Sequence, residues 1–175
     1  MPEAALRVGI VTVSDRASRG EYPDQSGPAV HAALDQGLRS AWTPVTRCVP
    51  DDCAAIEQAL VALADDARCD LVLTTGGTGP APRDVTPEAT QAVCDRLLPG
   101  LGEAMRAASL VRVPTAMLSR QVAGLRGACL VINLPGKPAA VAECLPVVLP
   151  AIAHCVVLLG GPRVQLVTPV IDPHA

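Results

Sequence analysis

Residues 70–80 read DLVLTTGGTGP, an apolar run that ends abruptly in a glycine-rich turn. The apolar centre, Leu71 to Leu73, is typical of a short buried strand, and the glycines and proline predict a loop that continues to Asp84. Thr86-Pro87-Glu88 follows, where threonine can cap a helix, proline fits its first turn and an acid complements its dipole. This stretch therefore predicts a strand, a glycine loop and a helix in succession.

The same alternation extends to both sides of this stretch. Apolar runs predict further strands at Leu6 to Val13, Trp42 to Val49 and Cys129 to Leu134, and the polar segment Ser14 to Ser26 predicts a loop. Helical spacing predicts helices over Pro28 to Ser40, from Asp51 or Asp52 through Leu63, from Thr86 to about Leu97, over Leu101 to Val111, and from Gly136 to near Gly160. Strands that alternate with helices predict parallel pairing, right-handed crossovers and helices on both faces of one sheet.

Composition limits the class of protein. The 175 residues predict a single domain, 1–175, and a net charge of -3 with one Trp, one Tyr and no Phe argues against nucleic-acid partners and an anionic membrane surface. The seven cysteines show no Cys-x-x-Cys pair and are expected to act as small buried hydrophobes. The start of the chain lacks the pattern of a secretory signal, so we expect a cytoplasmic protein. The apolar stretch Cys144 to Leu159 is interrupted by prolines and is expected to be a buried helix.

Four polar segments directly follow predicted strands, and in an open α/β sheet ligands bind beyond the carboxyl ends of the strands. We therefore expect these segments to share one site: Ser14-Asp15-Arg16, Pro50-Asp51-Asp52, Thr75 to Pro80 together with Arg83-Asp84, and Asn133-Leu134-Pro135-Gly136-Lys137-Pro138.

The glycine turn is suited to phosphate binding. Backbone N–H groups of Gly76-Gly77-Thr78-Gly79 can approach an anion without side-chain obstruction, and Thr75 and Thr78 add hydroxyl donors. The spacing matches neither the P-loop nor the dinucleotide motif. A tight turn that uses glycine only for backbone freedom is the alternative, and Arg83 and Asp84 in the same loop favour phosphate.

Charged residues in the other segments complete the expected site. Asp51 and Asp84 could hold Mg²⁺ through carboxylate oxygens, although Asp51 could instead cap a helix and Asp52 competes for either role. Arg16 and Arg120 could pair with phosphate oxygens, or could be ordinary surface arginines. Lys137, the single lysine of the chain, precedes a predicted helix, where anions are favoured; an exposed lysine without a ligand is the alternative.

These motifs closely resemble the molybdopterin adenylyltransferases of molybdenum-cofactor biosynthesis, the MogA and MoaB family to which the G domains of eukaryotic molybdenum-cofactor proteins are related. The resemblance covers about 150 residues, a domain-sized stretch. The matching blocks are Val8 to Ser18, Leu73 to Pro80, Arg83 to Pro87, Pro99 to Glu103, Leu118-Ser119-Arg120 and Asn133 to Pro138.

The resemblance implies a three-layer α/β/α fold with a mostly parallel sheet, usually trimeric, which uses Mg²⁺ and ATP to adenylylate the terminal phosphate of molybdopterin. A molybdenum-insertion protein would act next. It implies Asp51 and Asp84 as the catalytic and metal-binding pair, and substrate contacts from Ser14, Asp15, Arg16, Thr75, Gly76, Gly77, Thr78, Gly79, Arg83, Ser119, Arg120, Asn133, Pro135, Gly136 and Lys137.

Two other functions remain open at this point. One is a non-catalytic molybdopterin-binding or scaffold domain, and the other is a related enzyme of the same fold that acts on another phosphorylated nucleotide. Pro82 departs from the family pattern, since close relatives often carry a basic residue there, but Arg83 is retained.

Overall fold

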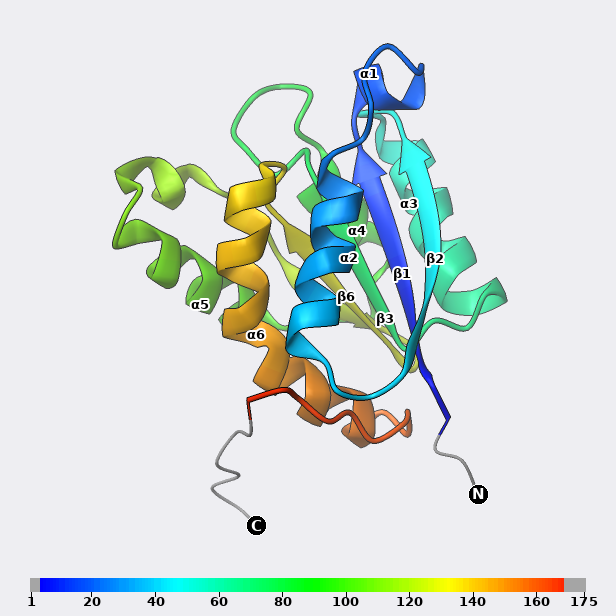
Figure 1. Cartoon of the computed structure of the whole chain (residues 1–175). Coiled ribbons are helices and arrows are strands. Elements are labelled where there is room, and N and C mark those ends of the chain that lie inside the picture. Colours follow the sequence, from blue (N-terminus) through cyan, green and yellow to red (C-terminus); the bar gives the residue numbers. More distant parts are fainter. Residues whose placement is uncertain (1–3, 169–175) are drawn as a thin grey trace.

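In the computed structural model, which describes residues 4–168, six strands form one sheet in the order β2-β1-β3-β6-β5-β4. Four strands are parallel: β1 (Leu6–Val13), β2 (Trp42–Val49), β3 (Leu71–Thr75) and β6 (Cys129–Leu134). The other two, β5 (Ala123–Arg126) and β4 (Arg96–Leu97), extend the sheet beyond β6 in antiparallel pairing. The glycine-rich segment leaves the sheet at the carboxyl end of β3, next to the ends of β1 and β6 (Figure 1).

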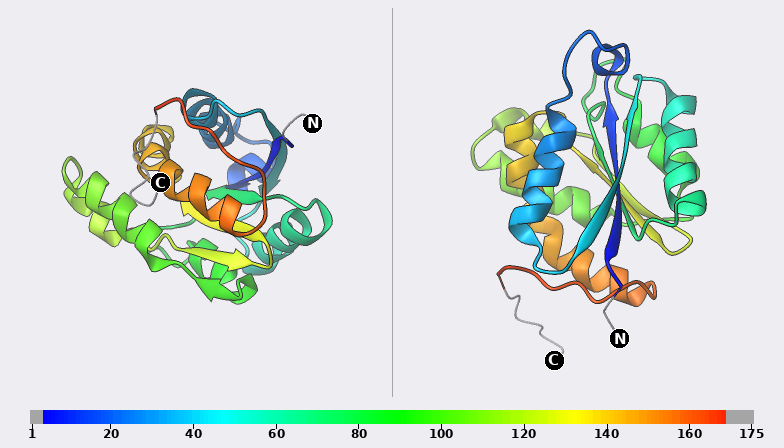
Figure 2. Two further views of the ribbon diagram at one scale, coloured as in Figure 1. Left: turned by 90° about the horizontal axis from the view of Figure 1, so that it is seen from below. Right: turned by 45° about the vertical axis from the view of Figure 1, so that its right-hand side comes forward.

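Helices cover both faces of the sheet, which gives three layers (Figures 1 and 2). One face carries α2 (Ser26–Gly37), α5 (Pro99–Leu110) and α6 (Pro138–Leu158). The other carries α3 (Cys53–Val61), its π-helical extension η1 (Ala62–Asp66) and α4 (Thr86–Val93). A single turn, α1 (Asp15–Ser18), follows β1, and a 3-10 segment, η2 (Pro114–Leu118), follows α5.

The two faces of the central strands build two separate aliphatic cores. In β1, Val8 and Ile10 pack towards α2 and α6, whereas Val11 and Val13 pack towards α3 and α4. This division follows from the two-residue period of side chains along a strand, as expected for a parallel sheet covered on both faces. The two cores fix the strand ends from which the polar loops emerge.

Several predicted boundaries need correction. The segment Ser14 to Ser26 is not only a loop, because Ser14 caps α1 by accepting from the backbone N–H of Ala17 at 3.3 Å. Thr86 is the first residue of α4 and not its cap. The helix predicted to reach Leu97 ends at Val93, and the chain then forms β4, which the sequence analysis missed together with β5.

Helix α6 is long and apolar enough to cross a membrane by length and composition alone. Its inner face is buried, however, and packs with α2, α5 and the sheet in the larger core; the buried residues include Val141, Leu145, Val148 and Ile152. This arrangement is that of a core helix, as the interrupted apolar run predicted.

Candidate functional site

A cleft of about 650 Å³ opens beside the carboxyl end of β3. Three segments line it: the glycine loop at Thr78, Gly79 and Pro80; α5 and η2 between Arg106 and Gln121; and the start of α6 from Pro135 to Glu143. Its volume lies within the range of small-molecule sites. Of the residues predicted from sequence, the cleft brings together Thr78, Gly79, Ser119, Pro135 and Lys137.

Glycine is required at the turn itself. Gly76 has φ +100°, and a Cβ there would lie 2.4 Å from the carbonyl oxygen of Val13. Gly77 has φ +63°, and its Cβ would lie 2.3 Å from Oγ1 of Thr86. That threonine is fully buried; its hydroxyl donates to the carbonyl of Gly76 at 2.9 Å and its N–H to the carbonyl of Gly77 at 3.1 Å. The start of α4 therefore holds the turn in a left-handed conformation that only glycine adopts without strain.

The glycine loop offers backbone donors. Among residues 4–168, no hydrogen bond uses the N–H groups of Gly77, Thr78 or Gly79. Thr78 is nearly buried, and both Thr78 and Gly79 line the cleft. Successive unpaired N–H groups on a cleft wall form an anion-binding concavity.

The start of α6 provides a second anion-binding feature on the same cleft. Lys137 is the N-cap residue of this 21-residue helix, and both it and Ala139 line the cleft. Gly136 lies against the glycine loop, since a Cβ on it would be 3.2 Å from Cα of Gly76. The positive end of the helix dipole and an exposed ammonium group thus lie on the same cleft as the donors of the glycine loop.

Asp84 lies at the far end of the glycine loop and is half-buried. Its Oδ2 accepts from the backbone N–H of Ala81 at 3.0 Å, and a Cβ at Gly79 would approach this oxygen to 2.8 Å. The absence of a side chain at Gly79 therefore leaves room for the Asp84 carboxylate. Arg83 is exposed, and within the described residues it makes no side-chain hydrogen bond or ion pair.

The Arg120 guanidinium is hydrogen-bonded within the protein, and its predicted pairing with phosphate oxygens stays a prediction. Its Nε donates to the carbonyl of Gly79 at 2.9 Å, its Nη2 donates to the carbonyl of Asp84, and its Nη1 pairs with Oε1 of Glu88. The guanidinium is thus occupied within the loop. The hydrogen bond with Arg120 holds the pKa of the Glu88 carboxyl below its usual range.

Asn133 and Thr75 also act inside the protein. The Asn133 side chain is fully buried; its amide donates to Oγ1 of Thr74 at 3.1 Å and of Thr90 at 2.8 Å, and its Oδ1 accepts from the N–H of Val122 at 3.3 Å. The Thr75 hydroxyl donates to the carbonyl of Pro135 at 2.7 Å. Both side chains join strand ends and loops in this structure, and their predicted ligand contacts stay predictions.

The segments after β1 and β2 form a second polar group. Oδ2 of Asp51 accepts from the N–H of Asp15 at 2.9 Å, and Oδ1 of Asp15 accepts from the N–H of Asp51 at 3.0 Å. Asp52, not Asp51, caps α3, because its Oδ1 accepts from the N–H of Ala55 at 2.8 Å. Asp51 therefore does not cap α3. Arg16 is exposed and stacks over Tyr22, 5.4 Å from the ring centre.

The predicted site is thus divided. The two aspartates and most other predicted residues do not line the cleft beside the glycine loop: Ser14, Asp15, Arg16, Asp51, Thr75, Gly76, Gly77, Arg83, Asp84, Arg120, Asn133 and Gly136. No group of three or more His, Cys, Asp or Glu side chains suited to a metal ion occurs among residues 4–168. Asp51 and Asp84 each keep one carboxylate oxygen, Oδ1, without a hydrogen bond inside the described chain. Mg²⁺ typically takes one or two carboxylates and completes its shell with water and substrate phosphates, so the donor types fit this ion.

Sequence reasoning missed the wall formed by α5. Arg106 and Arg112 line the cleft, and Arg106 donates to the carbonyl of Gln121 at 2.9 Å. Ser109 also lines it and donates to Glu143 at 3.2 Å. Arg106 and Ser109 are three residues apart and share one face of α5, a spacing that was present in the sequence, whereas Arg112 follows the end of the helix.

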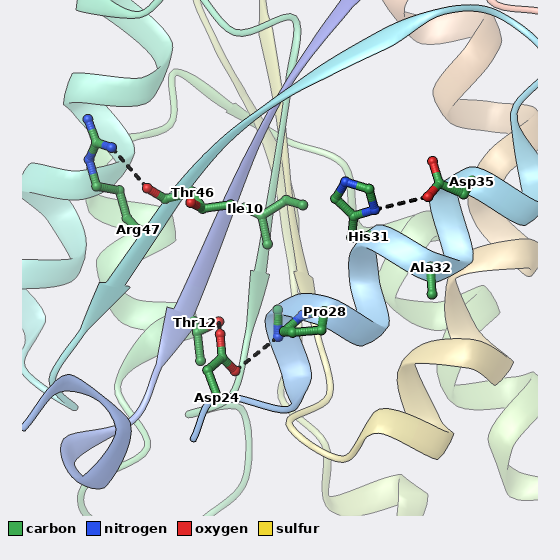
Figure 3. Close-up of a pocket in the computed structure, with 10 residues that line it drawn as sticks. Ile10, Thr12, Asp24, Pro28, His31, Ala32, Asp35, Thr46 and Arg47 are labelled. Carbon is green, nitrogen blue, oxygen red and sulfur yellow. Dashed lines mark hydrogen bonds and ion pairs between the residues drawn. The ribbon is translucent and has the colours of Figure 1, made fainter. Parts of the chain in front are cut away.

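A separate pocket of about 480 Å³ lies between α2, β1 and β2 (Figure 3). Several of its polar side chains form hydrogen bonds or ion pairs within the pocket. Asp24 accepts from the hydroxyl of Thr12 at 2.7 Å and from the N–H of Gly27 at 3.0 Å, and His31 pairs with Asp35 at 3.0 Å. This pocket lies apart from the glycine loop, and no residue of that loop lines it.

The fold and the cleft define a molybdopterin-binding domain, since residues 9–154 match the family described as "Probable molybdopterin binding domain". The molybdopterin adenylyltransferase of Helicobacter pylori (strain ATCC 700392 / 26695) is 50% identical over 161 residues, with 92% of each chain covered. That of Escherichia coli K12 is 49% identical over 172 residues, covering 91% of this chain and 88% of the relative.

Solved structures agree with the sequence comparisons. The molybdopterin biosynthesis enzyme MoaB of Thermus thermophilus superposes with a TM-score of 0.82 at 46% identity, covering 90% of this chain and 99% of that one. The chain belongs to the MogA and MoaB family of molybdenum-cofactor biosynthesis proteins, whose curated relatives are molybdopterin adenylyltransferases.

Proposed function

We propose that the protein transfers the adenylyl group of Mg-ATP to the terminal phosphate of molybdopterin, giving adenylyl-molybdopterin and pyrophosphate. One observation carries the proposal: the unpaired N–H groups of Thr78 and Gly79 and the Lys137 end of α6 lie on a single cleft. Two anion-binding features on one cleft suit a reaction in which the phosphate of one substrate meets the triphosphate of another.

The same cleft has an apolar wall. Val113, Ala116, Leu118 and Ala140 line it opposite and beside the phosphate-binding features. A flat pterin ring needs apolar contact on its faces and polar partners at its edge, and Ser119 and Gln121 supply polar groups on the same wall. The cleft therefore combines the chemistry required for a phosphorylated heterocycle.

In the proposed reaction, a phosphate oxygen of molybdopterin forms a bond to the α-phosphorus of ATP. The bond from that phosphorus to the bridging oxygen breaks, and pyrophosphate leaves with the electron pair. The protein holds the two phosphates together and stabilises their charge, which are the main contributions to transfers at phosphorus. Asp51 and Asp84 would hold Mg²⁺, which neutralises part of the charge on the triphosphate when bound.

The described residues offer no activated nucleophile that would favour a covalent intermediate. Burial raises the pKa of the cysteine thiols, that of Cys94 to about 11, so their thiolate fraction at neutral pH is small. Direct attack by the substrate phosphate agrees with this chemistry.

Substitution of the two aspartates tests the metal assignment. Asp51→Asn and Asp84→Asn should each abolish or strongly reduce the formation of adenylyl-molybdopterin from Mg-ATP and molybdopterin. Asp52→Asn is the matched control and should keep full activity. It removes the carboxylate next to Asp51, and asparagine still caps α3 because it caps helices as well as aspartate does. Full activity of both Asp51→Asn and Asp84→Asn would refute the assignment.

The same assay separates the alternative function. Molybdopterin binding without product would support a non-catalytic binding or scaffold domain. We further propose a cytoplasmic homotrimer that delivers its product to a molybdenum-insertion protein, as the family resemblance implies. Sedimentation at micromolar concentration, with the mass of three chains as the expected result, tests the trimer.

A further inference from the structure

We infer that Arg120 and Glu88 form a positioning clamp that sets the place of Asp84 and the shape of the glycine loop, and that Arg120 does not bind phosphate itself. The inference rests on the proposed function, because Asp84 is the group that the clamp would serve.

The contacts of Arg120 reach both ends of the loop between Gly79 and Asp84. The guanidinium donates to the carbonyl of Gly79 at 2.9 Å and to the carbonyl of Asp84, and the backbone N–H of Arg120 donates to the carbonyl of Thr78 at 2.8 Å. The planar guanidinium of Arg120 thus bridges the two ends of the loop. Its five donors lie in a fixed fork, so the spacing of the two carbonyls is fixed as well.

Glu88 holds the fork in place from α4. Its Oε1 pairs with Nη1 of Arg120, and its Oε2 lies 3.4 Å from Nη2. The Arg120 side chain keeps 38% of its surface exposed and that of Glu88 keeps 51%, so the pair contributes little to stability as a salt bridge. The ion pair instead fixes the position of the Arg120 guanidinium relative to α4. Because α4 is anchored by buried residues including Ala89 and Thr90, it supports the loop through this pair.

Asp84 is the residue fixed by this arrangement. Its carbonyl accepts from Arg120, its N–H donates to the carbonyl of Ala81 at 2.9 Å, and its Oδ2 accepts from the N–H of Ala81 at 3.0 Å. Arg120 and Glu88 do not contact the carboxylate, so they act on it through the backbone. Glu88, like Asp84 and Arg120, does not line the cleft.

Steady-state kinetics of the full chain test the clamp. We expect Arg120→Lys, which keeps the charge and loses the fork, and Glu88→Gln, which keeps the shape and loses the charge, to lower kcat by at least about tenfold with little change in KM, since small misplacements of reacting groups cost rate. The double variant should be no slower than Arg120→Lys alone, because both changes break one device.

Arg126 and Asp65 provide a matched control. Arg126 donates to both carboxylate oxygens of Asp65, at 3.0 and 2.6 Å, and to the carbonyl of Val93 at 2.8 Å, at the end of the sheet opposite the glycine loop. Arg126→Lys and Asp65→Asn should leave kcat within about twofold. A direct phosphate role for Arg120 predicts a different result: Arg120→Lys raises KM for ATP or molybdopterin and Glu88→Gln changes nothing. That pattern would overturn the clamp.

Amide hydrogen exchange separates failure of the clamp from failure of the proposed function. In Glu88→Gln, the N–H groups of Ala81 and Asp84, whose hydrogen bonds close the loop, should exchange faster than in the unmodified protein and in Asp65→Asn. Unchanged exchange at these positions would overturn the clamp even in an active enzyme. A protein that makes no adenylyl-molybdopterin but shows the faster exchange would retain the clamp and refute the function.

Discussion

Replacement of Asn133 by leucine tests whether this residue is structural, as its contacts indicate, or a ligand contact, as its sequence position predicted. It is the single asparagine of the chain and lies at the end of β6, beside the glycine loop. Its side chain joins three elements: β3 through Thr74, α4 through Thr90, and the segment before β5 through Val122. Leucine has almost the same shape and none of these hydrogen bonds.

The expected loss follows from the number of bonds removed. Three hydrogen bonds at about 0.5–1.5 kcal/mol each, with the half-buried Val122 N–H left without its partner, predict a decrease of about 2–4 kcal/mol in the free energy of unfolding. Thr90→Val removes two hydrogen bonds, the one accepted from Asn133 and the one donated to the carbonyl of Thr86 at 2.9 Å, and should cost about 1–3 kcal/mol. The double variant should lose less than the sum, because the two side chains share one hydrogen bond.

Urea unfolding followed by circular dichroism measures these differences from the midpoint at an unchanged slope. Kinetics are then measured on the folded Asn133→Leu protein, at conditions well below its unfolding midpoint. The KM values for ATP and molybdopterin should lie within about threefold of those of the unmodified protein, because a structural residue affects substrate binding only indirectly. A variant of unchanged stability with strongly raised KM would show that the amide binds substrate and would refute the structural role.

Three further perturbations have expected outcomes. Gly76→Ala forces a Cβ to within 2.4 Å of a backbone carbonyl at φ +100°, so thermal unfolding should show a loss of at least about 2 kcal/mol together with lost turnover; a stable, active variant would contradict the required left-handed turn. Asp52→Ala removes the cap of α3 and should lower the free energy of unfolding by about 1 kcal/mol in urea while adenylylation continues, in contrast to Asp51→Asn. Loss of turnover in Asp52→Ala would indicate that Asp52, and not Asp51, is the metal-binding aspartate. The pKa of Glu88 is lowered from its ordinary 4.5, so the small contribution of its ionised carboxylate to stability is present above pH 4.5 and declines as the pH falls through the lowered value. The difference in urea unfolding midpoint between Glu88→Gln and the unmodified protein should therefore shrink over that pH range. A difference that stays constant with pH would contradict an ionised pair.

Much of the fold could be predicted because the central strands carry their own signal. β1 and β2 match the predicted bounds, Leu6–Val13 and Trp42–Val49, since long apolar or β-branched runs bounded by polar turns leave few alternatives. β4 and β5 were missed because they contain two and four residues, and β5 includes a glycine that lowers its strand propensity. These short strands form only through pairing with β6, a tertiary contact that local pattern does not contain.

The site was predicted as a region, and its individual roles required the structure. Strand-end position placed Thr78, Gly79 and Lys137 correctly beside one cleft. It could not show that the Asn133 amide and the Arg120 guanidinium are hydrogen-bonded within the protein, and their ligand contacts stay predictions. The sequence also could not decide whether Asp51 or Asp52 caps α3, because the two are adjacent and identical and only the backbone geometry shows which carboxylate reaches the N–H of Ala55.

The most direct test of the central claim follows the phosphorus atoms of ATP. The purified protein is incubated with Mg²⁺, molybdopterin and ATP labelled at either the α- or the γ-phosphate. The proposed reaction predicts that the α-label enters the pterin product and the γ-label is released as pyrophosphate. Transfer of the γ-label to the pterin, or release of labelled phosphate with no labelled pterin, would contradict adenylyl transfer at the glycine loop.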